Sequence, residues 1–275
     1  MSIFSAWVCY NISMVFTWAF RRQILYVVIL LLILGAFGLW VVYPYFNKLP
    51  SCADGIRNGD EAGVDCGGSC ARACLYQVDQ VSVLWARAFQ VVPGRYNAVA
   101  YLENHNSASA IRKISYEFRF ADKDNLYIGR RDGVTTIPAS GRFAVFEPGL
   151  DFGNSAPVYV TFRFTQTPDW LQVPKERLDN VKLLVSDISL SGEKSSPLLS
   201  AQVANDSLFI LPDVKVIAIL YDKNGNAVTA SSTYISELAA GESKTVNFTW
   251  PEPLPNTVVD KEVIPMYDIF QARLR

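Results

Sequence analysis

One short segment, residues 52–74, gathers most of the side chains in this sequence that could do chemistry. It reads CADGIRNGDEAGVDCGGSCARAC and has no apolar periodicity, so it must be held together by cross-links or by a metal. Its cysteines are Cys52, Cys66, Cys70 and Cys74. An even number of cysteines in an oxidising compartment predicts two disulfides. The pairing Cys52–Cys70 with Cys66–Cys74 is preferred only because it avoids a tight loop between neighbouring cysteines.

The same segment carries carboxylates, the hard oxygen ligands that suit calcium. They are Asp54, Asp60, Glu61 and Asp65. The ligand spacing of an EF-hand is absent, so calcium is a candidate ligand only, and no other cofactor is expected. Zinc held by the four thiolates is a further alternative. The cysteine spacing disfavours zinc, because it lacks the paired C-x₂-C knuckles of a zinc ribbon.

The rest of the sequence lacks the residue combinations that enzymes use. Its one histidine, His105, lies in a polar turn, and no G-x-S-x-G motif supplies a nucleophile. Asp151-Phe152-Gly153 spells a kinase tripeptide, but no glycine-rich phosphate loop or H-R-D motif accompanies it, so a turn is predicted. We therefore expect no catalytic residue and interpret the chain as non-enzymatic. The alternative is an enzyme or calcium-dependent receptor with its site in residues 52–74.

An apolar stretch precedes the cysteine-rich segment and determines where the chain resides. Residues 24–42 contain no charge, and as a helix they would rise about 28 Å, close to the thickness of a bilayer core. Arg21 and Arg22 precede the stretch, while Trp40 and Tyr43 mark its other end. The basic pair predicts a cytoplasmic N-terminus, residues 1–23, and extracytoplasmic C-terminal domains on a single-pass protein of the cell membrane.

Two features near this stretch leave alternatives open. Leu49-Pro50-Ser51-Cys52 resembles a lipobox, but lipidation of Cys52 would leave an odd number of extracytoplasmic cysteines, so an uncleaved anchor is favoured. Residues 1–20 are apolar without a clear pattern. They predict either an interfacial helix or a translation start at Met14, which would leave a short cytoplasmic segment.

Beyond the stalk, residues 43–74, the pattern is one of strands and turns. Apolar residues alternate with polar ones over 114–120, the period of a half-buried strand. Residues 114–128 correspond to residues 214–228 at an offset of 100, and flanking segments correspond as well. A repeat of this length made of short strands predicts two tandem immunoglobulin-like β-sandwiches, residues 75–174 and 175–275. The fold class is therefore mainly β. The net charge of −1 gives no sign of the positively charged surface that binds nucleic acid.

Two parts of the chain resemble known sequence families. Ile219-Leu220-Tyr221-Asp222 and the turn after it resemble the FxLYD type of immunoglobulin-like domain, with Ala218 at the position of the phenylalanine. This resemblance implies small extracytoplasmic sandwiches, usually without catalysis. Residues 52–74 resemble a Cys/Gly/Asp motif of secreted and surface-anchored proteins, which supports location more than activity. The glycosylation sequons at Asn205 and Asn247 matter only in a eukaryotic secretory pathway, and the chain is interpreted as bacterial.

One strand of the second repeat differs from its counterpart in a way that suggests a contact surface. In the first repeat Glu117 and Arg119 lie on the solvent face, whereas Ile217, Ile219 and Tyr221 occupy the equivalent positions of the second. A sandwich strand needs one apolar face, so the second face requires a cover. The linker around Trp170 or the run 264–270 is one candidate for this cover. The other is a partner protein or a second copy of this chain.

These observations predict a membrane-anchored extracytoplasmic interaction or structural protein. A subunit of a pilus-like or secretion assembly, polymerising through the apolar N-terminus, is a further alternative.

Overall fold

The computed structural model describes residues 18–46 and 50–274. The chain divides into two compact units, residues 1–51 and 52–275, which are described separately. Our expectations for residues 1–17, the interfacial helix and the start at Met14, lie outside the described residues.

The first unit contains one helix, α1 (Trp18–Phe46), which extends beyond the expected span at both ends. Its segment Trp18–Pro44 has a mean hydropathy of 2.8 and is long and apolar enough to cross a membrane. The Arg22 guanidinium lies 4.6 Å from the ring centre of Trp18 and donates a hydrogen bond to the Tyr26 hydroxyl at 3.0 Å. Charged and aromatic residues therefore meet at one end of the apolar helix, as at a membrane interface.

The second unit begins with the stalk and a short 3₁₀ turn, η1 (Leu75–Gln77), followed by the strands of the first repeat. These strands are β1 (Ser82–Val92), β2 (Arg95–Asn104), β3 (Ser109–Ala121), β4 (Tyr127–Ile137), β5 (Gly141–Asp151), β6 (Tyr159–Phe164) and β7 (Leu171–Gln172). They form two antiparallel sheets of order β1-β2-β5 and β4-β3-β6, and β7 pairs with the start of β3.

A short helix, α2 (Lys175–Asn180), leads into the second repeat. Its strands are β8 (Leu183–Ser191), β9 (Leu198–Asn205), β10 (Phe209–Tyr221), β11 (Ala227–Leu238), β12 (Ser243–Thr249), β13 (Asp260–Met266) and β14 (Arg273–Leu274). The sheets are β8-β9-β12 and β11-β10-β13, with β14 on the start of β10. Strand for strand this order is the one of the first repeat, as the offset in sequence predicts.

Matching side chains hold matching loops in the two repeats. Asn104 ends β2 and is 1% exposed, and its Nδ2 donates hydrogen bonds to the carbonyls of Ser109 and Pro138. Asn205 ends β9 with the same exposure, and its Nδ2 donates to the carbonyls of Phe209 and Leu238. A buried amide must find such partners, so these residues fix the strand ends in both repeats.

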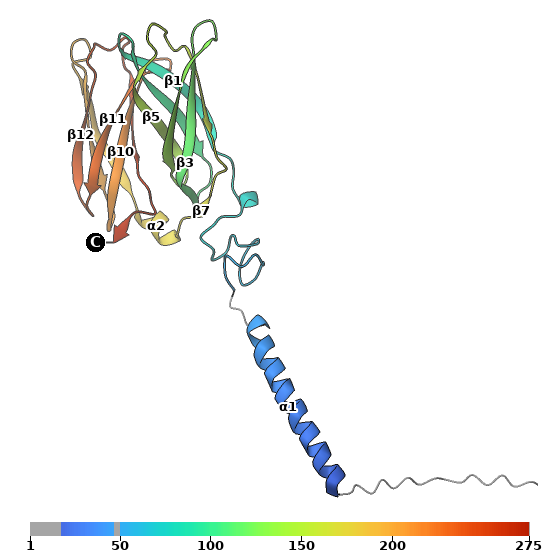
Figure 1. The fold of residues 1–275 in the computed structure, drawn as a ribbon. Helices are drawn as coiled ribbons and strands as arrows, with labels where there is room; N and C mark the ends of the chain where they lie inside the picture. Colours follow the sequence, from blue (N-terminus) through green and yellow to red (C-terminus); the bar gives the residue numbers. More distant parts are fainter. Residues whose placement is uncertain (1–17, 47–49, 275) are drawn as a thin grey trace, which may run out of the picture. The chain divides into compact units, whose positions relative to one another are not determined.

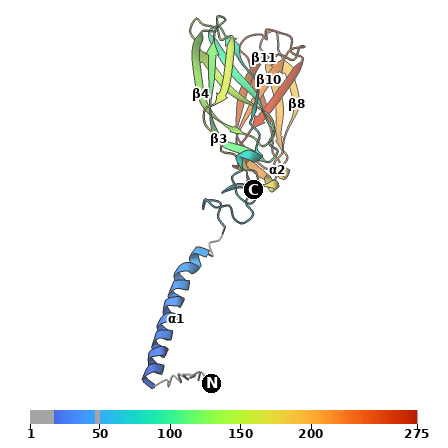
Figure 2. The ribbon, with the colours of Figure 1, turned by 90° about the vertical axis from the view of Figure 1, so that its right-hand side faces the viewer.

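The two repeats stack on each other so that four sheets lie in layers (Figure 1 and, turned by 90°, Figure 2). Strands β2 and β5 of the first repeat contain runs of consecutive buried residues, Ala98–Leu102 and Phe143–Glu147. Because side chains alternate between the faces of a sheet, such runs require burial on both sides. One face of β1-β2-β5 packs on β4-β3-β6, and the other packs on β11-β10-β13 of the second repeat.

Polar contacts complete this junction between the repeats. Lys215 Nζ donates a hydrogen bond to the carbonyl of Phe146 at 2.9 Å, and Asn97 Nδ2 donates to the carbonyl of Ala230 at 3.3 Å. Burial lowers the pKa of the Lys215 ammonium, while the charge of Glu147 opposes that shift. The repeats therefore meet through a packed apolar core and oriented hydrogen bonds, and residues 52–275 form one compact unit.

This packing predicts that the second repeat depends on the first for stability. Ile219 is fully buried at the junction, so Ile219→Ala should lower the free energy of unfolding by about 2–5 kcal/mol, the usual cost of such a cavity. Leu184→Ala, on the exposed face of β8, is the matched control and should change it by less than about 0.5 kcal/mol. Chemical denaturation measures both values, and equally small losses would contradict the stacking.

Candidate functional site

The stalk is cross-linked and docked onto the first sandwich. Its disulfides join Cys52 to Cys70 and Cys66 to Cys74, the pairing preferred from the sequence. The amide of Ala73 donates to the carbonyl of Trp170 at 2.9 Å, and the amide of Gln172 donates to the carbonyl of Ala71 at 2.8 Å. These bonds attach the stalk to the chain around β7. The stalk is therefore a folded part of the second unit.

Within the described residues the four candidate calcium ligands do not form a group with the spacing of a metal site, and each accepts hydrogen bonds inside the stalk. Asp65 accepts hydrogen bonds from the amides of Asp54 and Gly55, both at 3.0 Å. Asp60 accepts from the Ser69 hydroxyl at 2.7 Å. The remaining acceptors are Asp54, bonded by the Ile56 amide and the Asn58 side chain, and Glu61, bonded by the Asn58 and Asp65 amides.

Among the described residues, one cluster has the spacing of a metal site, and it consists of Cys52, Glu61 and Cys70. Its two sulfur atoms belong to a disulfide and offer no thiolate, so the zinc alternative is wrong for this structure. The sequence shows carboxylates close together in the chain, but it does not show that loop amides already engage them. The observation that suggested calcium thus has a structural explanation.

Two of the three candidate partner residues of the second repeat, Ile217 and Ile219, are internal, so the prediction is wrong for them. Ile217 and Ile219 are fully buried and belong to the core that contains β1, β2 and β5. The cover is thus the first repeat, and neither the segment around Trp170 nor the run 264–270 supplies it. Trp170 is buried in the first repeat, and Ile264 pairs beside Ile217 in the same sheet. Sequence patterning reveals that such a face needs a cover, but it does not identify the cover.

Tyr221, the third of these residues, borders a cleft at the junction. The cleft has a volume of about 480 Å³, and Trp85, Tyr101 and Arg142 of the first repeat also line it. The Tyr101 and Tyr221 hydroxyls donate to the two carboxylate oxygens of Glu262 at 2.6 and 2.8 Å. Burial, followed by the bond to Glu262, raises the pKa of both tyrosines, so they remain neutral donors that tie the repeats together.

His105 lies apart from these features. Its Nε2 is 3.3 Å from the Ser82 hydroxyl at an exposed position, and no carboxylate contacts the ring within the described part of the chain. A serine–histidine pair needs a group that orients the imidazole, so this pair lacks the third member of a hydrolytic triad.

The outward surface of β4-β3-β6 carries a network of four ion pairs, and we call this surface the front face. The register of the strands places its side chains in four rows. These rows are Tyr127, Ala121 and Tyr159; Arg130, Arg119 and Thr161; Asp132, Glu117 and Arg163; and Val134, Ser115 and Thr165. The second repeat uses the equivalent surface to pack on the first, and Glu117 and Arg119 stand where it has Ile217 and Ile219.

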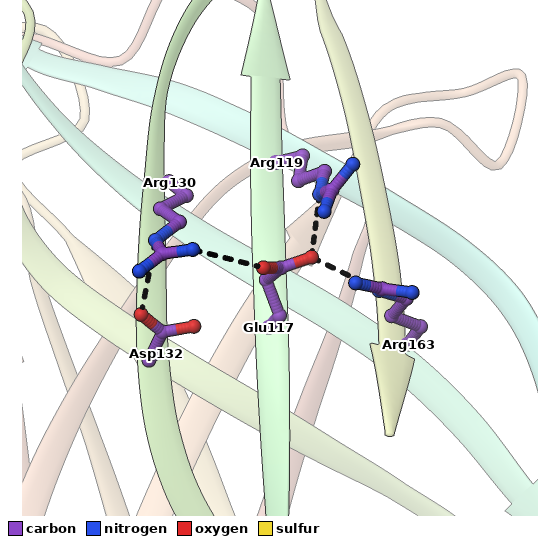
Figure 3. A network of polar contacts seen from close by, with 5 residues as sticks. All are labelled: Glu117, Arg119, Arg130, Asp132 and Arg163. Atoms are coloured by element: carbon purple, nitrogen blue, oxygen red, sulfur yellow. Dashed lines mark hydrogen bonds and ion pairs between the residues drawn. The ribbon is translucent and has the colours of Figure 1, made fainter. Parts of the chain in front are cut away.

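Glu117 is the centre of this network (Figure 3). Its Oε1 accepts hydrogen bonds from Arg119 Nε at 2.5 Å and from Arg163 Nε at 2.9 Å. Arg130 lies on the other side, with Nη1 3.8 Å from Glu117 Oε2 and Nε 3.3 Å from Asp132 Oδ2. The Glu117 side chain is 4% exposed, although it lies on the outer face of the sheet. The arginines, Arg119 foremost, hold the pKa of this carboxyl below its ordinary value.

Sequence reasoning placed Ser115, Glu117 and Arg119 on the solvent face of a half-buried strand but did not identify this network. Glu117 and Arg119 lie two residues apart, whereas Arg130 and Arg163 come from other strands. The available signal was the exchange of two isoleucines in one repeat for a charged pair in the other.

No protein-family model matches this chain, and no curated protein matches it. Among solved structures it is similar to red sea bream transglutaminase, with 14% identity and a TM-score of 0.25 over 72% of this chain and 31% of that one. It is also similar to a Bacteroides uniformis beta-glucuronidase, with 14% identity and a TM-score of 0.20 over 63% and 26% of the two chains. The chain thus spans under a third of their length, and similarity at this level identifies neither family nor activity.

The disulfide pairing can be tested with pairs of serine substitutions. Cys52→Ser with Cys70→Ser removes one whole disulfide, so no free thiol should be detected in the denatured, unreduced second unit (residues 52–275). Cys66→Ser with Cys74→Ser should give the same result. Cys52→Ser with Cys66→Ser removes one partner from each disulfide, so both remaining cysteines should react with a thiol reagent. Reactive thiols in the first two variants, or none in the third, would require a different pairing.

The charge on Glu117 predicts a pH-dependent contribution to stability. Its pKa is lowered in the folded state, so the stabilisation is present above the ordinary carboxyl pKa and is lost as the pH falls through the lowered value. We expect Glu117→Gln to lower the melting temperature at pH 7 and to approach the wild type at strongly acidic pH. Thermal melts of both proteins across this range measure the effect. A constant difference between them would contradict an ionised Glu117.

Proposed function

We propose that this chain is a single-pass membrane protein, with α1 as its anchor, that presents a non-enzymatic interaction module outside the cytoplasm. The observation that carries this proposal is the stacking of two sandwiches into one unit that follows an anchor-like helix in the sequence. Sheets buried on both faces cannot move independently, so the surfaces of the unit keep a constant geometry. Such a unit is suited to holding a partner near the membrane.

Location and orientation rest on charge and redox chemistry. Arg21 and Arg22 precede the apolar part of α1, which favours an N-terminus in the cytoplasm. Disulfides persist in oxidising compartments, and both disulfides of the described residues lie after the helix. The resemblance of the second repeat to FxLYD-type domains, in a chain with bacterial character, supports the same interpretation.

The non-enzymatic part of the proposal rests on how the reactive side chains are used. The stalk carboxylates accept hydrogen bonds from within the stalk. Glu262 accepts a hydrogen bond across the junction between the repeats, and Glu117 accepts hydrogen bonds on the front face. The Ser82–His105 pair lacks an orienting acid among the described residues.

One cross-linking experiment tests both orientation and function. A membrane-impermeant amine cross-linker is added to intact spheroplasts that express the full chain, and the products are identified by mass spectrometry. Lysines of the sandwiches, such as the exposed Lys123, should link to a defined set of extracytoplasmic proteins. Permeabilised spheroplasts and a chain ending at residue 49 are the controls.

Two results would contradict the proposal. Cross-links to sandwich lysines that form only after permeabilisation would show that the unit lies inside the cell. Accessible lysines that link to nothing beyond the background of the shortened chain would exclude an interaction module.

A further inference from the structure

The front face has a property that stability alone does not require. Arg119 and Arg163 both bond Glu117 through Nε. A guanidinium has five N–H donors, four of them on its terminal nitrogens. In the described residues no hydrogen-bond acceptor engages the Nη groups of these two arginines, whose side chains are 52% and 61% exposed. Two guanidiniums thus meet at one carboxylate oxygen while their terminal donors reach solvent.

This arrangement is preorganised for an anion. Arginine loses considerable side-chain freedom when it binds a ligand, and a contact that already orients it removes part of that cost. Glu117 provides this contact for both arginines from a position that is itself almost completely buried. The planar ends of the arginines present the paired N–H groups that match a carboxylate.

The charge and composition of the face indicate which anion it fits. Three arginines face Glu117 and Asp132, which leaves one positive charge uncompensated. Nucleic acids are bound through many cationic contacts, so this excess is too small for them. Tyr127 and Tyr159, 63% and 53% exposed, flank the arginines on the same face. Tyrosine and arginine are the residues enriched at the centres of protein–protein interfaces.

The other end of the stack argues against a second copy of this chain as the occupant. Stacking between chains in the manner of the repeats would place the outer face of β12-β9-β8 on the front face. By its register, the paired residues of that outer face are uncharged, and Asp187 lies beside them at the bulge of β8. These paired residues are Leu184, Ser186, Ser189 and Ser191 of β8, Leu198, Ser200, Gln202 and Ala204 of β9, and Ser243, Thr245, Asn247 and Thr249 of β12. The carboxylate of Asp187 already accepts a hydrogen bond from Ser186 Oγ at 3.2 Å, whereas an acidic segment offers several free carboxylates to the arginines.

We propose that the front face binds a carboxylate of an acidic segment in a partner protein through the Nη groups of Arg119 and Arg163. Glu117 acts as a positioning residue that holds the two guanidiniums. This inference rests on the proposed function, because it names the partner chemistry of the interaction module.

The test uses the full chain in nanodiscs of zwitterionic lipid and hexaglutamate as the probe, titrated calorimetrically at low salt. The peptide should bind, and salt should weaken the binding. Arg119→Gln and Arg163→Gln should each weaken it by roughly 10- to 100-fold, the usual effect of losing charge-assisted hydrogen bonds. Arg273→Gln, an exposed arginine of the second repeat, is the matched control and should leave the affinity unchanged. Arg163→Lys keeps the charge but loses the planar fork, so it should bind less tightly than the wild type and also serves if Arg163→Gln fails to fold.

Glu117→Gln separates positioning from simple attraction. It raises the net positive charge of the face, so attraction alone predicts tighter binding of hexaglutamate. Loss of the positioning carboxylate predicts weaker binding by several-fold, and this difference in sign decides between the two. Thermal melts must show that the variant remains folded at the temperature of the titration.

Several results would overturn the inference. Arg119→Gln and Arg163→Gln could both bind hexaglutamate with wild-type affinity, or Arg273→Gln could lose as much affinity as they do. Glu117→Gln could bind the peptide more tightly than the wild type. The protein could also bind a heparin fragment but not hexaglutamate. None of these results contradicts the proposed function, because a partner cross-linked to the sandwiches outside the cytoplasm would then bind at another surface. Conversely, hexaglutamate binding with cross-links only after permeabilisation would overturn the proposed function and leave the site intact.

Discussion

Burial of the junction between the two repeats is the constraint on which the rest of the second unit, residues 52–275, depends. Ile217 and Ile219 present a second apolar face on a strand that already packs against its own sandwich. Covering large aliphatic side chains contributes about 1.5–3 kcal/mol each, so leaving this face in water would weaken a small sandwich considerably. The first repeat provides the cover with β1-β2-β5. The result is a four-layer body with buried inner sheets.

The same logic explains why equivalent faces of the two repeats differ in chemistry. In stacked repeat proteins the terminal repeats need a polar outer surface to remain soluble. The first repeat is terminal on the side of β4-β3-β6, and Glu117 with its arginines replaces the isoleucines there. A buried acid surrounded by exposed arginines is more than a soluble surface requires, since isolated polar residues would suffice. The ordered contacts between Glu117 and its arginines are the reason why we propose a partner for the front face.

The stalk is stabilised in a different way from the sandwiches. It has too few apolar residues for a core, so two disulfides and acids that accept backbone amides hold it together. Its bonds to the residues around β7 make it an extension of the first repeat. The acids that resemble metal ligands in the sequence thereby have a structural role in the stalk.

The sequence by itself determined the features that depend on local pattern. The charge-free run within α1, the alternation along β3 and the offset of 100 residues between repeats predicted one apolar helix and a mainly β unit. The even number of cysteines after the helix predicted disulfides, because that inference needs only composition and compartment. Tertiary structure alone decided which surface covers Ile217 and Ile219, where the acids of the stalk point, and that Arg130 and Arg163 join Glu117. The physical reason is that hydrophobic burial is non-directional, so an apolar pattern shows that a face must be covered but not which surface covers it. The shapes of the packed sheets determine the covering surface, and the register of the strands determines which distant charges lie side by side.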